Sequence, residues 1–471
     1  MKRELTMAES FTHKGEWFLP SAKDKRIHGV LSYNIEDGIT LDLVGVYDDN
    51  PLRAVPEWLS NHPPHEHSII LGETNEGKKI TLYKNYSIPT GSIFNPASRY
   101  RVHVVLEGLH FENPEDMHFD TLESEIIHLD EWIGISGFDG KEISKEVSKI
   151  LFSDEEHECQ VNYKRPDTIH FLVSETLEGE FHFSLQSNGA HAYQKNVFLE
   201  QKVYLTLKYK QEQFFDVLLA DLHKFKGFVT LALYERAMPK TIRLYNGNGE
   251  VKLFFQPIGT FPKRETPKTH FEMLFCYENI KDNFPELIKK WFEKYDILKP
   301  IFNLFIAQFY TAEAFMENKF LNLAQAAEAF HAHTRETIKM PKKDYDRMTK
   351  DILSSVNENY HDFLKGLFNF GNHLNLEDRL NDIMLSISCE FFDEIIEDRK
   401  KFMKQVKWLR NYYTHYSSDL KKHALKGPEL FNLTQKLKVI LVCAFLLEIG
   451  FDKDLLNKLL KGQKHRLVPE L

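Results

Sequence analysis

The sequence predicts an α+β fold class, with a β-rich N-terminal half followed by an all-α helical bundle. Two patterns along the chain indicate this. Up to about residue 275, apolar residues alternate in short runs that turn residues interrupt, which is the period of strands. From Asn283 onward, apolar residues recur every three or four positions, which is typical of amphipathic helices. We therefore predict two domains, at residues 1–275 and 276–471.

Strands are expected throughout the N-terminal half. Residues 28–47, HGVLSYNIEDGITLDLVGVY, form two alternating runs around an Asp-Gly pair, which predicts a hairpin. A short helix is expected around EWIGISGF at 131–138, and a proline-rich passage at 256–268 closes this half. Further alternating runs lie at residues 78–87, 180–187 and 202–210, with an Asn- and Gly-rich turn at 245–250.

Helices are expected throughout the C-terminal half, where strand signals are absent. Residues 284–298 and 301–340 carry the helical spacing most plainly. Further helices are expected near residues 343–357, 376–388, 390–414, 430–449 and 452–460.

Composition favours a soluble protein in a reducing, cytoplasmic setting. The four cysteines are scattered and form no CxxC pair, so neither a disulfide framework nor a zinc site is indicated. The N-terminus lacks the apolar segment of a signal peptide. The longest apolar run, at 439–447, is too short to span a bilayer, so no membrane partner is expected.

The net charge of −9 is unevenly divided. Residues 1–280 contain 30 basic and 42 acidic residues, whereas residues 281–471 contain 30 basic and 27 acidic residues. One basic segment of the C-terminal half is opposed only by Asp419, and such a patch can bind phosphate even on an acidic protein. A solvated helix face explains the charge equally well. The segment contains Lys400, Lys401, Lys404, Lys407, Arg410, Lys421, Lys422 and Lys426.

Two other motifs are better explained without a ligand. GETNEGKK at 72–79 approaches a phosphate-binding loop, but Lys79 replaces the required hydroxyl and a strand follows, so a hairpin turn at Glu76-Gly77 is favoured. His62, His65 and His67 could hold a metal, but nothing completes the site, so a polar loop is favoured.

The segment RNYYTH places Arg410, Asn411 and His415 within the basic cluster. An arginine followed at this distance by a histidine is a weak pattern, and the chain has two other matches, starting at Arg165 and Arg264. Both of those lie in proline-containing segments of the β-rich half. Only Arg410 is followed by asparagine and lies late in a helical region.

RNYYTH, as Arg-Asn-x-x-x-His near the end of an all-helical domain, resembles the signature of HEPN ribonucleases. LNLAQAAEAFHAHTRE at 321–336 resembles an early HEPN helix of the ApeA-like subgroup. The N-terminal half resembles the ApeA N-terminal domain at residues 13–20, 28–45 and 106–137.

The resemblance implies an anti-phage defence protein that causes abortive infection. Its HEPN domain would be a toxic, metal-independent endoribonuclease without a cofactor, acting on host RNA, with tRNA a frequent target. The β-rich region would restrain it until a phage-derived trigger is sensed. HEPN families bring two motifs together at a dimer seam, and the single motif here implies a homodimer.

The residues themselves suit this chemistry. RNA carries its own nucleophile, so cleavage needs a proton shuttle and a cation for the phosphorane. His415 can exchange protons at cellular pH, and the Arg410 guanidinium can bind two phosphate oxygens. Asn411 would orient either one. In the helical half, His331 and His333 lie two residues apart on different helix faces, so they predict no metal site.

Several neighbouring residues have two interpretations each. Glu328 is either a supporting site residue or an ordinary helix-pairing carboxylate. The tyrosines of the motif are either core residues, which is favoured, or surfaces for stacking bases. The expected RNA-binding patch contains Lys404, Lys407, Lys421 and Lys422, and the tyrosines are Tyr412, Tyr413 and Tyr416.

Helix geometry constrains the site. Positions five apart on an ideal helix differ by about 140°, so Arg410 and His415 do not share a face, whereas Asn411 and His415 do. Either the helix ends before His415, or the site is composite between two chains. The competing hypotheses are a structural helix end, a catalytically silent adaptor, and a sensor module acting through protein contacts.

Overall fold

The computed structural model divides the chain into two compact units, Met1–Lys289 and Lys290–Leu471, whereas the sequence pattern predicts the division at residue 275. Each unit is described by itself below. The residues that the structure describes are 5–47, 66–88, 97–152, 160–188, 196–257, 261, 266–310 and 314–469.

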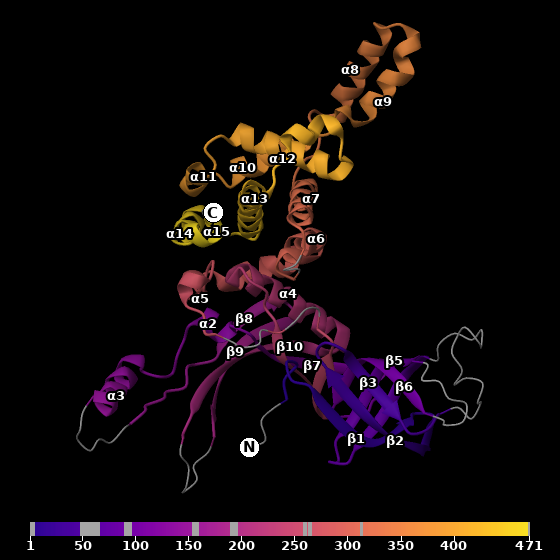
Figure 1. The fold of residues 1–471 in the computed structure, drawn as a ribbon, viewed down its shortest axis with the longest axis vertical. Coiled ribbons are helices and arrows are strands. Elements are labelled where there is room, and N and C mark those ends of the chain that lie inside the picture. The colour runs from indigo at the N-terminus through magenta and orange to yellow at the C-terminus, as the bar shows by residue number, and fades with distance from the viewer. Residues whose placement is uncertain are drawn as a thin grey trace. The chain divides into compact units, whose positions relative to one another are not determined.

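The first unit is built on an antiparallel sheet, so the β-rich prediction is confirmed (Figure 1). The strand order among the described residues is β3-β2-β1-β4-β5-β6-β12-β11-β7-β10-β9-β8, and an additional β3–β6 pairing closes the first six into a barrel. The strands are β1 Phe11–Leu19, β2 Ala22–Asn34, β3 Gly38–Leu43, β4 Glu66–Thr74, β5 Lys79–Ile88, β6 Ser98–Glu107, β7 His118–Ile126, β8 Ile169–Ser174, β9 Leu177–Ser187, β10 Leu199–Phe214, β11 Pro239–Asn246 and β12 Gly249–Phe255.

The predicted turns lie where the sequence placed them. Asn34 pairs with Gly38 across the β2–β3 hairpin, and Gly38 has a φ of +86°, which glycine adopts without strain. The near phosphate-binding loop is the β4–β5 hairpin, in which the Gly77 N–H donates to the Thr74 carbonyl at 2.8 Å. That segment is therefore a turn, as favoured from the sequence.

Helices and aromatic rings cover part of the sheet. The expected helix at 131–138 is shorter and begins earlier, because Gly134 at φ +69° ends it. Trp132 is fully buried and contacts Phe228, Tyr277 and Phe284 with ring centroids 5.9–6.2 Å apart. The helices of this unit are α2 Leu129–Ile133, α3 Gly140–Phe152, α4 Phe215–Leu233 and α5 Tyr277–Ile280, with 3-10 turns η2 Pro114–Asp116 and η3 His270–Glu272.

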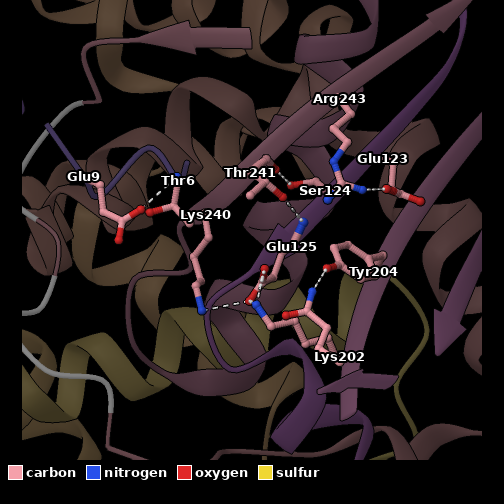
Figure 2. Close-up of polar contacts among 11 residues, drawn as sticks. Thr6, Glu9, Glu123, Ser124, Glu125, Lys202, Tyr204, Lys240, Thr241 and Arg243 are labelled. Atoms are coloured by element: carbon pink, nitrogen blue, oxygen red, sulfur yellow. Dashed lines mark hydrogen bonds and ion pairs between the residues drawn. The ribbon is translucent and has the colours of Figure 1, made fainter. Parts of the chain in front are cut away.

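A charged network crosses the sheet on β7, β10 and β11 (Figure 2). Glu125, buried on β7, forms ion pairs with Lys202 of β10 at 3.2 Å and Lys240 of β11 at 2.8 Å. Two positions along the same strand pair, Arg243 pairs with Glu123. Both carboxylates are therefore neutralised by cations of neighbouring strands.

The second unit is helical, so the predicted fold class is confirmed there as well. Among its described residues, β-structure is limited to an isolated bridge between Ile338 and His373. The α6 helix, which contains Pro300, begins in the first unit. The helices are α6 Phe284–Tyr310, α7 Met316–Thr334, α8 Lys342–Ser354, α9 His361–Gly371, α10 Leu376–Ser386, α11 Glu390–Ile395, α12 Arg399–His415, α13 Gly427–Glu448, α14 Lys453–Gly462 and α15 Lys464–Leu467, with 3-10 turns η4 Glu358–Tyr360 and η5 Ser418–His423.

Two helix predictions need correction. The helix expected at 390–414 is two helices, because the chain leaves helical geometry at Ile396 and Asp398 caps a new one by accepting from the Lys401 N–H at 2.9 Å. The α9 helix was not predicted. The α8–α9 pair extends from the other helices of its unit (Figure 1), and α9 has no buried residue.

The α13 helix forms the centre of the second unit. By length and composition alone it could cross a membrane, but 67% of its most apolar segment is buried inside the protein. Its Phe445 packs edge-on against Phe302, Phe305 and Phe330, with centroids 5.5–5.8 Å apart. This burial is that of the core helix of a helical bundle.

Candidate functional site

The RNYYTH motif lies on α12, an amphipathic helix. One face of α12 packs into the core through five buried side chains. The opposite face carries a polar stripe at helical spacing, formed by Lys404, Lys407, Asn411 and His415. The helix itself carries no acidic residue between its cap and Asp419. The buried side chains are Phe402, Met403, Val406, Leu409 and Tyr413.

Helix α12 continues through His415 and ends at Tyr416, whose backbone is left-handed at φ 49°. The alternative in which the helix ends before His415 is therefore wrong. Arg410 and His415 lie on one regular helix and point about 140° apart. Within one chain, the two side chains cannot converge on the same phosphate from the same face.

Arg410 lies at the border between the polar stripe and helix α7. Its Nη2 donates to Glu328 Oε2 at 2.8 Å, and its Nη1 donates to Asn411 Oδ1 at 3.1 Å. Both members of the ion pair are partly exposed, at 36% and 24%. Because a guanidinium has about five N–H donors, donors remain for a phosphate. The structure thus brings three of the sequence-predicted residues into direct contact.

His415 is exposed in the last turn of α12. No residue in the described part of the chain hydrogen-bonds to its imidazole. It shares the polar face with Asn411, one turn earlier. An exposed imidazole in this position can exchange protons with a bound substrate.

The basic residues surround this face. Lys404 is exposed, and Lys407 pairs with Glu377 of α10 at 3.1 Å, which offsets part of its charge. After the helix, η5 folds back: His423 stacks on Trp408 with centroids 4.1 Å apart. The exposed Lys421 and Lys422 lie on this segment.

The three tyrosines of the motif have different environments. Tyr413 is a core residue whose hydroxyl donates to the Leu425 carbonyl at 2.6 Å, and its burial raises the pKa of the phenol to about 12. Tyr412 is half-buried, and Tyr416 is 68% exposed. The expectation of core positions is therefore wrong for Tyr416.

Sequence reasoning missed the residues that hold α7 against α10. Buried His331 contacts Asp382 at 3.0 Å, and Arg335 also pairs with Asp382. Arg379 donates to the Glu328 carbonyl at 3.1 Å, so this contact fixes the turn that carries the Glu328 side chain. The charged segment EDRLND at 377–382 was the available signal, but nothing in the sequence indicated which helix it faced.

Burial lowers the pKa of His331, while its hydrogen bond with Asp382 acts in the opposite direction. For Asp382, burial acts to raise the pKa, but hydrogen bonds from Arg335 and His331 outweigh it and lower the value. The histidine is therefore favoured in its neutral form, next to an ionised carboxylate. His333 points elsewhere and is exposed, as the two-residue spacing predicts.

No group of three or more potential metal ligands occurs among the described residues. Of the histidines weighed as a metal site, His62 and His65 lie outside the described residues, as does Arg264 of a second Arg–His match. A cavity of about 520 Å³ in the second unit is lined by Phe402, Leu433 and Lys436, among others. It lies along the N-terminal half of α12, not at His415.

Family models match both parts of the chain. The model described as ApeA N-terminal domain 1 matches residues 12–291, and the model described as Apea-like HEPN matches residues 321–455. No curated protein and no solved structure matches. The two matches confirm the resemblance and the domain order that the sequence predicted.

Proposed function

Because this chain belongs to the ApeA family and carries an Apea-like HEPN domain, which indicates an anti-phage defence protein, we propose that it is a metal-independent endoribonuclease. HEPN domains are generally ribonucleases. The proposed substrate is host RNA, with tRNA the first candidate. Cleavage in the cytoplasm would stop the infected cell and with it the phage.

The observation that carries this proposal is an arrangement along helix α12, in which Asn411 and His415 share a cationic face and Arg410 lies at its border. Arg410 is held by Glu328 and Asn411 but keeps donors free, and His415 is exposed. A purely structural helix end does not require an exposed histidine that lacks a hydrogen-bond partner among the described residues, on the same helix as an oriented guanidinium. The arrangement suits binding and cleavage of a phosphodiester.

The proposed chemistry uses the 2′-hydroxyl of the RNA. His415 accepts the proton of that hydroxyl, and the imidazolium so formed protonates the leaving 5′-oxygen. Arg410 binds the phosphorane oxygens, whose charge grows in the transition state. The oxygen–phosphorus bond to the leaving 5′-oxygen breaks as the new bond to the 2′-oxygen forms. The products are a 2′,3′-cyclic phosphate and a 5′-hydroxyl.

The active form is proposed to be a homodimer. The angle of about 140° between Arg410 and His415 supports a composite site, in which the arginine of one copy faces the histidine of the other. Light scattering should then give two protomers for the active protein. An active enzyme that is monomeric at every concentration would contradict the composite site.

The first unit is proposed to sense infection through a phage-derived trigger and to restrain the helical unit until then. The net acidic residues 1–280 and the paired cations of the sheet support a regulatory, non-cleaving role. Bacteria expressing the full chain should show few new RNA ends before phage challenge and many afterwards.

The alternative is a catalytically silent adaptor or sensor that acts through protein contacts. That hypothesis expects His415→Ala and Arg410→Ala to leave phage protection unchanged as long as the protein folds. Sequencing RNA ends from phage-challenged cells that carry the wild type or His415→Ala separates the two. Ends that appear only with the wild type support the ribonuclease.

A further inference from the structure

Tyr416 combines an unusual backbone with an exposed ring. It follows His415 directly, its φ is 49°, and its N–H donates to the Tyr412 carbonyl at 2.6 Å. The left-handed conformation costs a side-chain-bearing residue about 1–2 kcal/mol, which is why glycine is usual at this position of a helix end. The ring is nevertheless 68% exposed, so burial of the ring offsets little of that cost.

Another helix of the same chain ends in the same way but packs its ring. Tyr234 caps α4 in the left-handed conformation, with φ 53°, and its hydroxyl is buried. Packing accounts for a tyrosine there. At Tyr416 the cap explains the backbone geometry but not the aromatic side chain. Among the described residues, its ring pairs with the rings of Tyr412 and Tyr413, at centroid distances of 5.5 and 6.4 Å.

The surroundings of Tyr416 suit a nucleobase. The exposed histidine precedes it, and η5, which starts two residues later, carries the exposed Lys421 and Lys422. Aromatic rings beside cations are the usual elements of single-strand recognition, in which the ring stacks on a base and the cations bind phosphates. Stacking contributes about 1–3 kcal/mol per base and tolerates any base.

We infer that Tyr416 is a stacking platform for an unpaired nucleobase next to the cleaved phosphate of a single-stranded or loop RNA. The inference rests on the proposed ribonuclease function and adds a binding residue to it. A stacked base fixes the nucleotide whose 2′-hydroxyl His415 must reach. The ligand class is therefore single-stranded RNA, not the base-paired stem of a helix.

Tyr416→Gly is the informative variant, because glycine suits the left-handed backbone while removing the ring. Its melting temperature should equal or exceed that of the wild type, and light scattering should show the same oligomer. The KM for a short single-stranded oligoribonucleotide should rise about 5- to 150-fold, the equivalent of the stacking energy. Tyr416→Phe, which keeps the ring, should recover most of that loss.

An abasic nucleotide placed on either side of the cut provides the matched test in the RNA. It should raise the KM of the wild type as much as Tyr416→Gly does. Combining the abasic substrate with Tyr416→Gly should raise KM little further than either change alone. An unchanged KM in a folded Tyr416→Gly protein, or a loss of the oligomer, would overturn the inference while leaving the ribonuclease intact. Failure of the wild type to cleave any RNA would overturn both.

Discussion

The sheet network of the first unit and the polar face of α12 both contain several cations, but the two regions differ in whether carboxylates pair with those cations. On the sheet, Lys202 and Lys240 meet the buried Glu125, and Arg243 meets Glu123 (Figure 2). On α12 and η5, the exposed Lys404, Lys421 and Lys422 have no carboxylate partner within the described chain.

The comparison distinguishes cations that stabilise the fold from cations that remain free to bind a ligand. A cation that meets a buried carboxylate is already neutralised, and its main effect is on folding. A cation exposed on a face without acids keeps a positive potential that attracts phosphate. Arg410 is intermediate, because Glu328 orients it without enclosing it. The same residue types therefore carry different roles in the two units.

The largest expected effect is on folding, at the sheet. Glu125→Ala removes the buried carboxylate that pairs with Lys202 and Lys240, both only 18% exposed, so the free energy of unfolding should fall by about 3 kcal/mol. Chemical denaturation measures this. The matched control is Glu112→Ala, whose pair with Lys23 is half-exposed and should contribute less than about 1 kcal/mol. Equal losses would show that burial does not distinguish these pairs.

The next effect is on catalysis, at the border of α12. Arg410→Ala should lower kcat about 100-fold, because an interaction with the phosphorane is lost, while stability changes by less than about 1 kcal/mol. Arg410→Lys should restore little, since it lacks the planar fork. Arg347→Ala, at an exposed position on α8, is the control. Wild-type kcat in Arg410→Ala would remove Arg410 from the mechanism.

A smaller effect concerns binding. Replacing Lys421 and Lys422 by alanine should weaken RNA binding several-fold and lower the slope of log affinity against log salt, by about 0.7 for each lost phosphate contact with a single strand. The matched control is the exposed pair Lys342 and Lys343 on α8. If both double variants behave alike, only the general charge of the unit matters.

The smallest effect is the pH dependence of the helical unit. Because the pKa of His331 is lower in the folded protein than its ordinary value, the unfolded chain binds more protons just below that value. The stability contribution is present above about pH 6.5 and is lost as pH falls through the folded pKa. His331→Gln should flatten urea-unfolding stability measured between pH 5 and 7, and His333→Gln should not.

Local patterns in the sequence predicted much of this account. The two halves, the hairpins at Gly38 and Gly77, and the helix carrying Arg410 depend on neighbouring residues, so periodicity and turn residues revealed them. The position of Arg410 and His415 on different faces of α12 also follows from their spacing of five residues on a regular helix.

What remained hidden depends on contacts between distant segments. Glu328 could be proposed but not placed against Arg410, because that contact needs α7 and α12 to pack at one angle. The contacts of Arg379 and Asp382 have the same origin. The exposure of Tyr416 was mispredicted because the helix ends at that residue, turning its ring away from the core that holds Tyr413.

The most direct test of the central claim is the chemistry of the cut ends. Purified wild type should cleave RNA in EDTA and leave 2′,3′-cyclic phosphate and 5′-hydroxyl ends, whereas His415→Ala, replaced at an exposed position, should fold normally and cleave at least about 100-fold more slowly. A 2′-deoxy substitution at the cut should block the reaction. Cleavage that requires a divalent ion, 5′-phosphate products, or full activity in His415→Ala would contradict the account.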